Sequence, residues 1–292
     1  MQVQKILLFG KGGQVGWELQ RSLAPLGEVV AVVFDSTDFC GDFTNLAGLA
    51  ETVRLVKPSI IVNAAAHTAV DKAESEPDLA RTINALAPGA IAAEAQKLGA
   101  WLVHYSTDYV FDGAGNQPYA PDDPTGPVGA YGRSKLAGEV GVRLAGGAHL
   151  ILRTSWVISA HGNNFVKTML RLGGARDSLD VVADQIGGPT PAAGIADALF
   201  VLAGAMRDGA TGGTHHFAGA PDTSWADFAR AIMAQAGLGC QIRDIASSQY
   251  PTPARRPLNS RLDCTSLRAY GIARPEWRQG LDDILTELGA KS

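Results

Sequence analysis

The chain has 292 residues, of which 46% are hydrophobic and 18% charged, and its formal net charge is −4. These proportions are typical of a globular protein with a sizeable core and exclude a disordered chain. The slight excess of acidic residues provides no basic field for nucleic acid or anionic lipid. We therefore expect neither a nucleic-acid partner nor a membrane surface.

The cellular location can also be anticipated from the sequence. No run of residues approaches the roughly 18 uninterrupted apolar positions of a membrane-spanning helix, and the start of the chain lacks the long apolar run of a secretory signal. The three cysteines, Cys40, Cys240 and Cys264, are too few for a disulfide framework and have no CxxC spacing. A cytoplasmic protein is expected.

Short β-branched runs alternate with longer helical segments over the first 155 residues. The strands are expected at 6–9, 29–33, 60–63, 102–106 and 150–153, and the helices at 14–26, 46–56, 79–98 and 131–144. The strands are nearly continuous apolar runs, as in a parallel sheet buried on both faces. This alternation predicts a doubly wound α/β sheet of the Rossmann type.

The alternation weakens after about residue 156. Glycine- and proline-rich stretches at 185–191 and 250–257 separate shorter elements, including a helix expected at 225–236 whose start could be capped by Asp222, Thr223 or Ser224. We expect a dinucleotide-binding domain at 1–156 and a mainly substrate-binding region at 157–292. Some segments of the second region are expected to return to the core of the first.

A glycine-rich turn follows the first expected strand directly. Gly10, Gly13 and Gly16 fit the pattern GxxGxxG, which lets the chain turn tightly and lets backbone amides approach a pyrophosphate at a helix N-terminus. The second strand offers Asp35 beyond its apolar run, but Val33 stands at the expected ribose-facing position and no arginine is near. The turn predicts a dinucleotide site and leaves the choice between NADH and NADPH open.

Tyr131 and Lys135 form a YxxxK pair, and on a helix they share a face. A lysine ammonium near a phenol would lower the phenol pKa from its usual value near 10, which would make Tyr131 a usable proton donor. Upstream, Ser106 and Thr107 end a buried strand, where ligands bind in this architecture. Their hydroxyls could hydrogen-bond a substrate oxygen as charge develops on it.

The combined motifs resemble the extended short-chain dehydrogenase/reductase family, and within it the reductases of nucleotide-linked 4-keto sugars. The matching stretches cover nearly the whole chain, namely 7–11 with 13–19, 62–74, 106–111, 131–139, 153–156, 162–165, 184–190, 256–257 and 259–260. The resemblance implies NADPH or NADH as the cofactor and a dTDP-linked 4-keto-6-deoxy sugar as the substrate.

The resemblance also implies residue roles. Thr107 would bind the sugar carbonyl, Tyr131 would protonate its oxygen, and Lys135 would hold the nicotinamide ribose. Substrate contacts would come from Thr107, Asp108, Tyr131 and Trp156. Cofactor contacts would come from Gly10, Gly13, Gln14, Val15, Gly16, Asp42, Phe43, Ala66, His67, Thr68, Tyr131 and Lys135.

One departure concerns magnesium. Family members with a magnesium-bridged dimer use three glutamates, and Glu18 and Glu287 match two of these positions, whereas Ala193 stands at the third. A hard cation would lose an oxygen ligand there. The missing glutamate argues against a metal-bridged dimer, while magnesium dependence and a homodimer both stay open.

Two other functions fit parts of the same pattern. A nucleotide-sugar epimerase or 4,6-dehydratase shares the fold, but dehydratases usually have an Asp-Glu pair after the strand-end threonine, where this chain has Asp108 and Tyr109. A non-catalytic regulatory subunit, such as the reductase-like partner of methionine adenosyltransferase, could keep the fold without the chemistry. The presence of Thr107, Tyr131 and Lys135 favours an enzyme.

Overall fold

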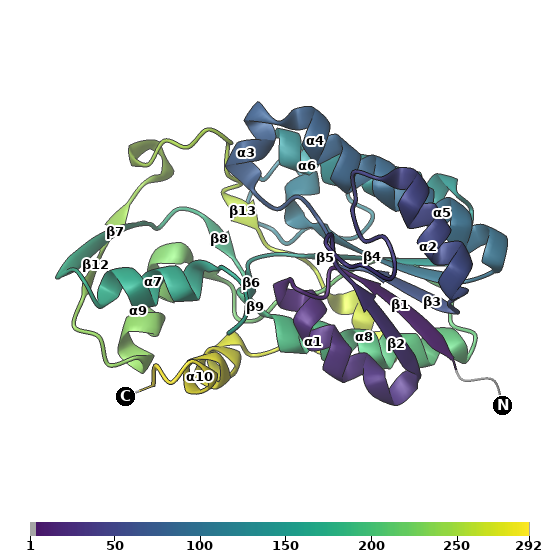
Figure 1. Cartoon of the computed structure of the whole chain (residues 1–292). Helices are drawn as coiled ribbons and strands as arrows, with labels where there is room; N and C mark the ends of the chain where they lie inside the picture. The colour runs from purple at the N-terminus through teal and green to yellow at the C-terminus, as the bar shows by residue number, and fades with distance from the viewer. Residues whose placement is uncertain (1–3, 292) are drawn as a thin grey trace.

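A six-stranded parallel sheet lies at the centre of the larger part of the molecule (Figure 1). The computed structural model describes residues 4–291. All neighbouring strands run parallel, and the order β10-β5-β4-β3-β1-β2 is that of a Rossmann-like sheet. The predicted fold class is confirmed. The strands are β1 (Lys5–Phe9), β2 (Glu28–Val32), β3 (Ile60–Asn63), β4 (Trp101–Thr107), β5 (His149–Thr154) and β10 (Gly213–His216).

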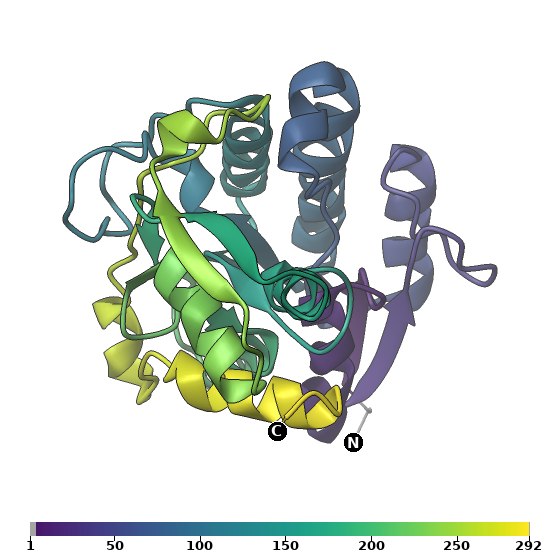
Figure 2. The ribbon, with the colours of Figure 1, turned by 90° about the vertical axis from the view of Figure 1, so that its left-hand side faces the viewer.

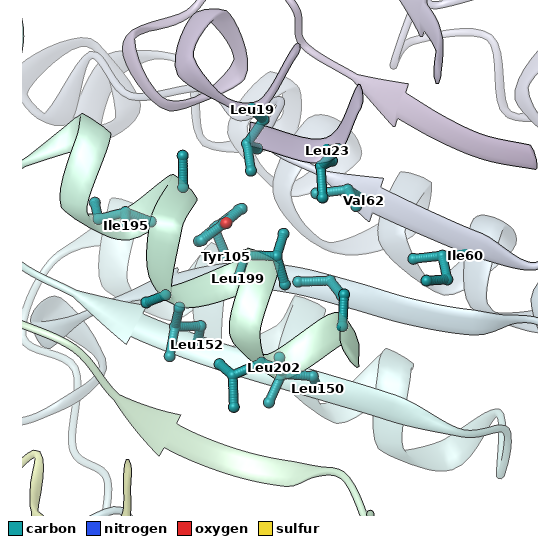
Figure 3. Close-up of a cluster of buried hydrophobic side chains, with 14 of the residues drawn as sticks. Leu19, Leu23, Ile60, Val62, Tyr105, Leu150, Leu152, Ile195, Leu199 and Leu202 are labelled. Atoms are coloured by element: carbon teal, nitrogen blue, oxygen red, sulfur yellow. The ribbon is translucent and has the colours of Figure 1, made fainter. Parts of the chain in front are cut away.

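Helices cover both faces of this sheet (Figure 1). On one face α1 (Gln14–Leu23) and α8 (Ala192–Arg207) pack side by side, and Figure 3 shows their leucine and isoleucine side chains meeting those of β3 and β5. The other face is covered by α2 (Leu46–Val56), α5 (Ala87–Leu98) and α6 (Ala130–Leu144). Because both faces are covered, the carboxyl ends of the strands are left to form the site.

Prolines change two of the helices expected from the sequence. The helix expected at 14–26 ends at Leu23, and a 3-10 turn, Ala24–Leu26, contains Pro25. The segment expected as one helix at 79–98 is helical throughout but is divided into the end of α4 (Pro77–Arg81), a π-helical turn (Thr82–Leu86) and α5; the additional helix α3 (Val70–Ser75) precedes it. Pro88 has no N–H to donate to the carbonyl four residues earlier, which disfavours a regular α-helical turn at that point.

The remaining elements form a lobe beside the carboxyl ends of the sheet (Figures 1 and 2). Its core lies among α7 (Phe165–Gly173), α9 (Trp225–Gln235), α10 (Trp277–Glu287) and the parallel pair β7 (Ser178–Val182) and β12 (Gln241–Ile245). Of the three capping candidates, Ser224 accepts a hydrogen bond from the Asp227 amide and begins α9. The short elements are β6 (Val157–Ile158), β8 (Ile186–Gly187), β9 (Thr190–Pro191), β11 (Thr223–Ser224), β13 (Asn259–Ser260) and the 3-10 turns Asp108–Val110, Ser247–Gln249 and Thr265–Tyr270.

Two segments of the second half belong to the N-terminal part, one as a strand of its sheet and one as a helix that packs on the sheet. Strand β10 pairs with β5 at the edge of the sheet, and α8 packs against α1. The division of the chain at residue 156 stays a prediction. Within residues 4–291, no helix combines the length and the hydropathy needed to cross a bilayer.

Candidate active site

The glycine-rich turn lies between the end of β1 and the start of α1. Gly10 has a φ of +88°, and a Cβ there would lie 2.7 Å from the Ala65 backbone nitrogen. A Cβ at Gly16 would lie 2.0 Å from the Gly10 carbonyl oxygen. Gly13 precedes α1 and no side chain caps the helix, so the first amides of α1, including those of Gln14 and Val15, are open to an anion. The turn fits a dinucleotide pyrophosphate.

The segment after β2 is arranged by local hydrogen bonds. The Val33 amide donates to the Ser36 hydroxyl at 2.9 Å. Asp42 accepts hydrogen bonds from the Thr44 amide at 2.8 Å and the Thr44 hydroxyl at 2.7 Å. Phe43 is 5% exposed and packs edge-on against Phe9. The Phe43 side chain therefore belongs to the core, and an adenine contact at this position would have to come from its backbone.

The loop after β3 is held by Asn84, a residue that the sequence did not single out. The Asn84 side chain accepts from the His67 amide at 2.8 Å and donates to the His67 carbonyl at 3.0 Å. It also donates to the Ser134 hydroxyl at 3.0 Å. Asn84 therefore ties the loop that carries Ala66, His67 and Thr68 to helix α6. The sequence signal for Asn84 is Pro88, which lacks the N–H that would donate to the Asn84 carbonyl in a regular α-helix.

One ring nitrogen of His67, in this loop, makes no hydrogen bond to the residues that the structure describes. Its Nε2 lies 3.6 Å from the Glu76 carboxylate, whereas its Nδ1 is buried with no hydrogen-bond partner in the part of the chain that the structure describes. A buried polar group usually has a partner. The free Nδ1 is consistent with a ligand contact, as the resemblance implied.

Tyr131 and Lys135 lie one helical turn apart at the start of α6. Lys135 is 3% exposed and donates from Nζ to the Tyr105 carbonyl at 2.6 Å. Burial lowers the pKa of Lys135 to about 8, and the nearby Glu139 carboxylate opposes that shift. Burial raises the pKa of Tyr131 above its usual value. The expected lowering of the Tyr131 pKa by lysine is wrong for this structure, because the ammonium contacts a carbonyl and burial dominates.

Thr107 and Asp108 follow β4 and lie next to Tyr131. The Thr107 hydroxyl donates to Asp108 Oδ1 at 3.0 Å and accepts from the Tyr109 amide at 3.2 Å. The Thr107 hydroxyl also lies beside the Tyr131 hydroxyl, and this contact lowers the pKa of Tyr131 against the larger effect of burial. The structure brings Thr107, Asp108 and Tyr131 together, as predicted.

Asp108 is a buried carboxyl group at the edge of this cluster. It is 3% exposed, and its Oδ2 has no hydrogen-bond partner among residues 4–291. Burial raises the pKa of Asp108 to about 6, against the opposing effect of the Ser260 and Thr107 hydroxyls. An acceptor oxygen is therefore free for a substrate hydroxyl.

Ser106 points to a different partner from Thr107. Its hydroxyl donates to Glu139 Oε1 at 2.5 Å. The same carboxylate accepts two hydrogen bonds from Arg153, at 2.8 and 2.7 Å, and one from Arg143 at 2.8 Å. Ser106 thus belongs to a buried ion-pair network beneath α6, and the suggestion that it contacts a substrate oxygen is not supported by its placement.

A segment of the second half crosses to the same region. Arg256 forms an ion pair with Asp71 at 2.6 Å, and the Ala254 amide donates to the other oxygen of Asp71 at 3.1 Å. Arg256 also lies beside Tyr109, whose ring meets that of Tyr131 edge-on with 5.3 Å between centroids. The sequence had marked Asp71 and Arg256 only as parts of matching stretches.

Trp156 comes two residues after β5. Its indole stacks on that of Trp225, with 3.6 Å between ring centroids. Gly187 lies against the edge of the Trp156 ring and also against Ser260, which neighbours Asp108. The structure therefore places Trp156 in the same wall as the strand-end residues.

Glu18 and Glu287 line one hollow of about 370 Å³ between α1, α8 and α10, and Ala193 lines it as well. Glu18 lies 3.5 Å from Arg21, and Glu287 lies 2.9 Å from His161. Within residues 4–291, no three His, Cys, Asp or Glu side chains gather as a metal-binding group. Asp197, Glu276 and Asp283 line the same hollow, but they do not gather with Glu18 and Glu287 into one such group.

Comparison with known proteins identifies the family. The family model described as the RmlD substrate binding domain matches residues 4–290. The chain belongs to this family. It is 49% identical over 291 residues to the dTDP-4-dehydrorhamnose reductase of Escherichia coli K12, with 97% of each chain covered. The family expected from the sequence is thus confirmed.

Solved structures agree with this family. A dTDP-4-dehydrorhamnose reductase from Clostridium acetobutylicum superposes with a TM-score of 0.92 at 36% identity, covering 98% of this chain and 100% of that one. The Bacillus anthracis dTDP-4-dehydrorhamnose reductase in complex with NADP gives 0.89 at 35% identity, with the same coverage. The whole chain, including the lobe, has the architecture of these RmlD-family proteins.

Proposed function

We propose that this RmlD-family protein is an NADPH-dependent reductase that converts dTDP-4-dehydro-6-deoxy-L-mannose to dTDP-L-rhamnose. The hydride goes to sugar C4 and the proton to the oxygen on that carbon, so that the carbonyl becomes a hydroxyl and the nicotinamide is oxidised. The observation that carries the proposal is the meeting of Thr107, Tyr131 and Lys135 at the carboxyl end of β4, in a chain 49% identical to a named reductase.

The residues present fit a dinucleotide. The glycine turn leaves no room for side chains at Gly10 and Gly16 and presents uncapped helix amides. Gln14 and Val15 begin α1, while Ala66, His67 and Thr68 follow β3 toward the nicotinamide half. A bound nicotinamide would supply the hydride. No acidic residue stands at Val33 to reject a 2′-phosphate, which favours NADPH, and NADH is the alternative cofactor.

Tyr131 acts as the proton donor. Its raised pKa keeps the hydroxyl protonated at neutral pH, which is the state that a reduction requires. The donor of Thr107 is directed to Asp108, so binding of the sugar carbonyl would turn that hydroxyl, and the free oxygen of Asp108 would accept from the sugar. Lys135 carries the positive charge that would hold the nicotinamide ribose. Together these groups orient the carbonyl for transfer.

A dehydratase or epimerase is less well supported. A dehydratase needs a second acid-base group after the strand-end threonine, and this chain has Tyr109 there. Burial and the adjacent Asp108 raise the pKa of Tyr109 to about 12, so the Tyr109 hydroxyl is a poor base near neutral pH. A regulatory subunit would have no need for the three assembled catalytic groups.

The location and assembly belong to the same proposal. All three cysteines are free thiols, which suits the reducing cytoplasm where reduced nicotinamide is available. A homodimer of this chain would not use the three-glutamate magnesium site of some family members, because Ala193 stands at the third glutamate position.

The deciding experiment follows NAD(P)H absorbance after addition of the dTDP-linked 4-keto sugar, prepared with a coupled dehydratase and epimerase. Oxidation of the cofactor with formation of dTDP-L-rhamnose is expected, with NADPH and NADH compared and with magnesium or chelator added. Rates that do not respond to chelator would agree with the incomplete metal site. A folded protein that binds the cofactor but leaves the absorbance unchanged would reject the reductase and favour a binding role.

A further inference from the structure

Trp156 has a backbone conformation that residues with a side chain rarely adopt. Its φ is +49°. In residues 4–291 the other non-glycine residue with a positive φ is Lys57, which ends helix α2 as a left-handed cap. Trp156 ends no helix. Such a conformation is strained and persists only where neighbouring groups hold it, commonly at functional sites.

The main group that holds the Trp156 side chain is Trp225. The two indoles stack with an interplanar angle of 14° and 3.6 Å between centroids. Phe165 packs on Trp225, with 4.5 Å between centroids, and the Thr190 amide donates to the Trp156 carbonyl at 2.9 Å. Trp225 is the first residue of α9, directly after the capping residue Ser224. The start of α9 therefore determines where the Trp156 indole lies.

The small sheet β11-β8-β13 connects this stack to the catalytic residues. Gly187 of β8 pairs with Thr223 of β11 and with Ser260 of β13. A Cβ at Gly187 would lie 2.9 Å from Cε2 of Trp156 and 3.0 Å from Cβ of Ser260. Ser260 in turn lies beside Asp108. The indole edge, Gly187, Ser260 and Asp108 thus form one continuous wall.

We propose that Trp225 is a positioning residue that determines affinity for the sugar. Its stack holds Trp156 in the strained conformation, and the indole then offers a rigid apolar surface to the C–H groups of a 6-deoxy sugar. The proposal rests on the proposed function, because that function places a nucleotide-linked deoxy sugar beside Asp108. Trp225 acts through Trp156 and needs no contact with the reacting atoms.

The test compares binding of dTDP-L-rhamnose with binding of dTDP alone. In Trp225→Ala, the dTDP-L-rhamnose Kd and the KM for the keto sugar are expected to rise about tenfold. The Kd values of dTDP and NADPH should change less than about twofold, and kcat less than about threefold. Trp225→Phe keeps an aromatic stack and should recover most of the affinity. Trp101→Phe, at the start of β4 and outside this stack, is the matched control.

A spectroscopic readout reports the stack directly, without turnover. Two indoles stacked face to face give an exciton-coupled circular dichroism signal, which should disappear in Trp225→Ala and persist in Trp101→Phe. Thermal unfolding shows whether each variant is folded. If Trp225→Ala loses the couplet and keeps wild-type affinity for dTDP-L-rhamnose, Trp225 only packs the lobe and the proposal is overturned.

The remaining outcomes are also distinguishable. If Trp225→Ala raises the Kd values of dTDP and dTDP-L-rhamnose equally, the wall binds the nucleotide and the proposed role in sugar binding is rejected. If Trp225→Ala does not fold, Trp225→Leu and Trp225→Phe replace it, and equal affinities in these two variants would reject the need for a stack. A wild-type protein that shows the couplet but neither binds dTDP-L-rhamnose nor oxidises NADPH would instead contradict the proposed function.

Discussion

The ammonium of Lys135 donates a hydrogen bond of 2.6 Å to the carbonyl oxygen of Tyr105 and is almost fully buried. Lys135 lies one turn after Tyr131 and one turn before Glu139 on the same helix. Its charge is therefore maintained against burial by a carbonyl dipole and by the Glu139 carboxylate. This arrangement leaves the pKa of Lys135 at about 8, below the usual value for lysine.

Cofactor affinity should fall as the pH rises through about 8, the lowered pKa of Lys135. Below this pH the ammonium is charged and can hold the ribose; above it, the amine is neutral. Tyr131 does not titrate in this range, because burial raises its pKa. The measurement is the NADPH Kd between pH 6 and about 9.5, and Lys135→Arg, which stays charged over that range, should remove the break. A break that survives in Lys135→Arg would assign it to another group.

Tyr131→Phe should reduce kcat by about 10²–10⁴-fold and leave the NADPH Kd close to that of the wild type, because it removes only the proton donor. Tyr109→Phe is the matched control. The Tyr109 ring lies 5.3 Å from that of Tyr131, but its hydroxyl lies beside Arg256 and its pKa is raised to about 12. Steady-state kinetics measures kcat, and a fluorescence titration measures the NADPH Kd of each variant. Substantial turnover by Tyr131→Phe, together with an inactive Tyr109→Phe, would exchange the two roles.

Gly16→Ala should abolish measurable cofactor binding, since the new Cβ would lie 2.0 Å from the Gly10 carbonyl oxygen and would force the turn open. Gly12→Ala in the same turn should bind NADPH with an affinity within about twofold of the wild type, because no atom lies within 4 Å of a Cβ there. Isothermal titration of both variants with NADPH provides the test. Similar affinities in the two variants would mean that the turn tolerates the displacement.

Arg153→Met should lower the free energy of unfolding by about 3–5 kcal/mol, because it leaves the buried Glu139 without its bidentate partner. Arg143→Met removes another hydrogen bond to the same carboxylate. The Arg143 side chain is 37% exposed, whereas that of Arg153 is 2% exposed, so this change should cost about 1 kcal/mol or less. Urea unfolding at pH 7 compares the two, and equal losses would show that burial does not set the strength of these pairs.

The parallel strands were predictable because each contains an apolar run, which is largely buried in β1, β3, β4 and β5 and half-buried in the edge strand β2. All five expected strands agree with the structure to within one residue at each end, and α2 agrees at both ends. Strand β10 was not predicted, since its sequence Gly-Thr-His-His has no apolar pattern and its place depends on pairing with β5. Long-range pairing of this kind leaves no local signal.

The candidate site was predictable where spacing along one element sufficed. The Tyr131–Lys135 pair and the glycine turn depend on local geometry, and both were identified. Asn84 was not, because its partners His67 and Ser134 lie 17 and 50 positions away in the chain. The direction of the Tyr131 pKa shift was also missed, since spacing reveals the nearby lysine but not how deeply the phenol is buried.

The pairing of β10 with β5 has a consequence for synthesis of the chain. Residues 213–216 leave the ribosome about sixty positions after β5, at residues 149–154. During that interval, the nascent sheet exposes an unpaired strand edge, and the apolar surface that α8 later covers is also open to water. A stalled or truncated product ending in the lobe would therefore be prone to aggregate, and chaperone binding should concentrate on nascent chains of this length.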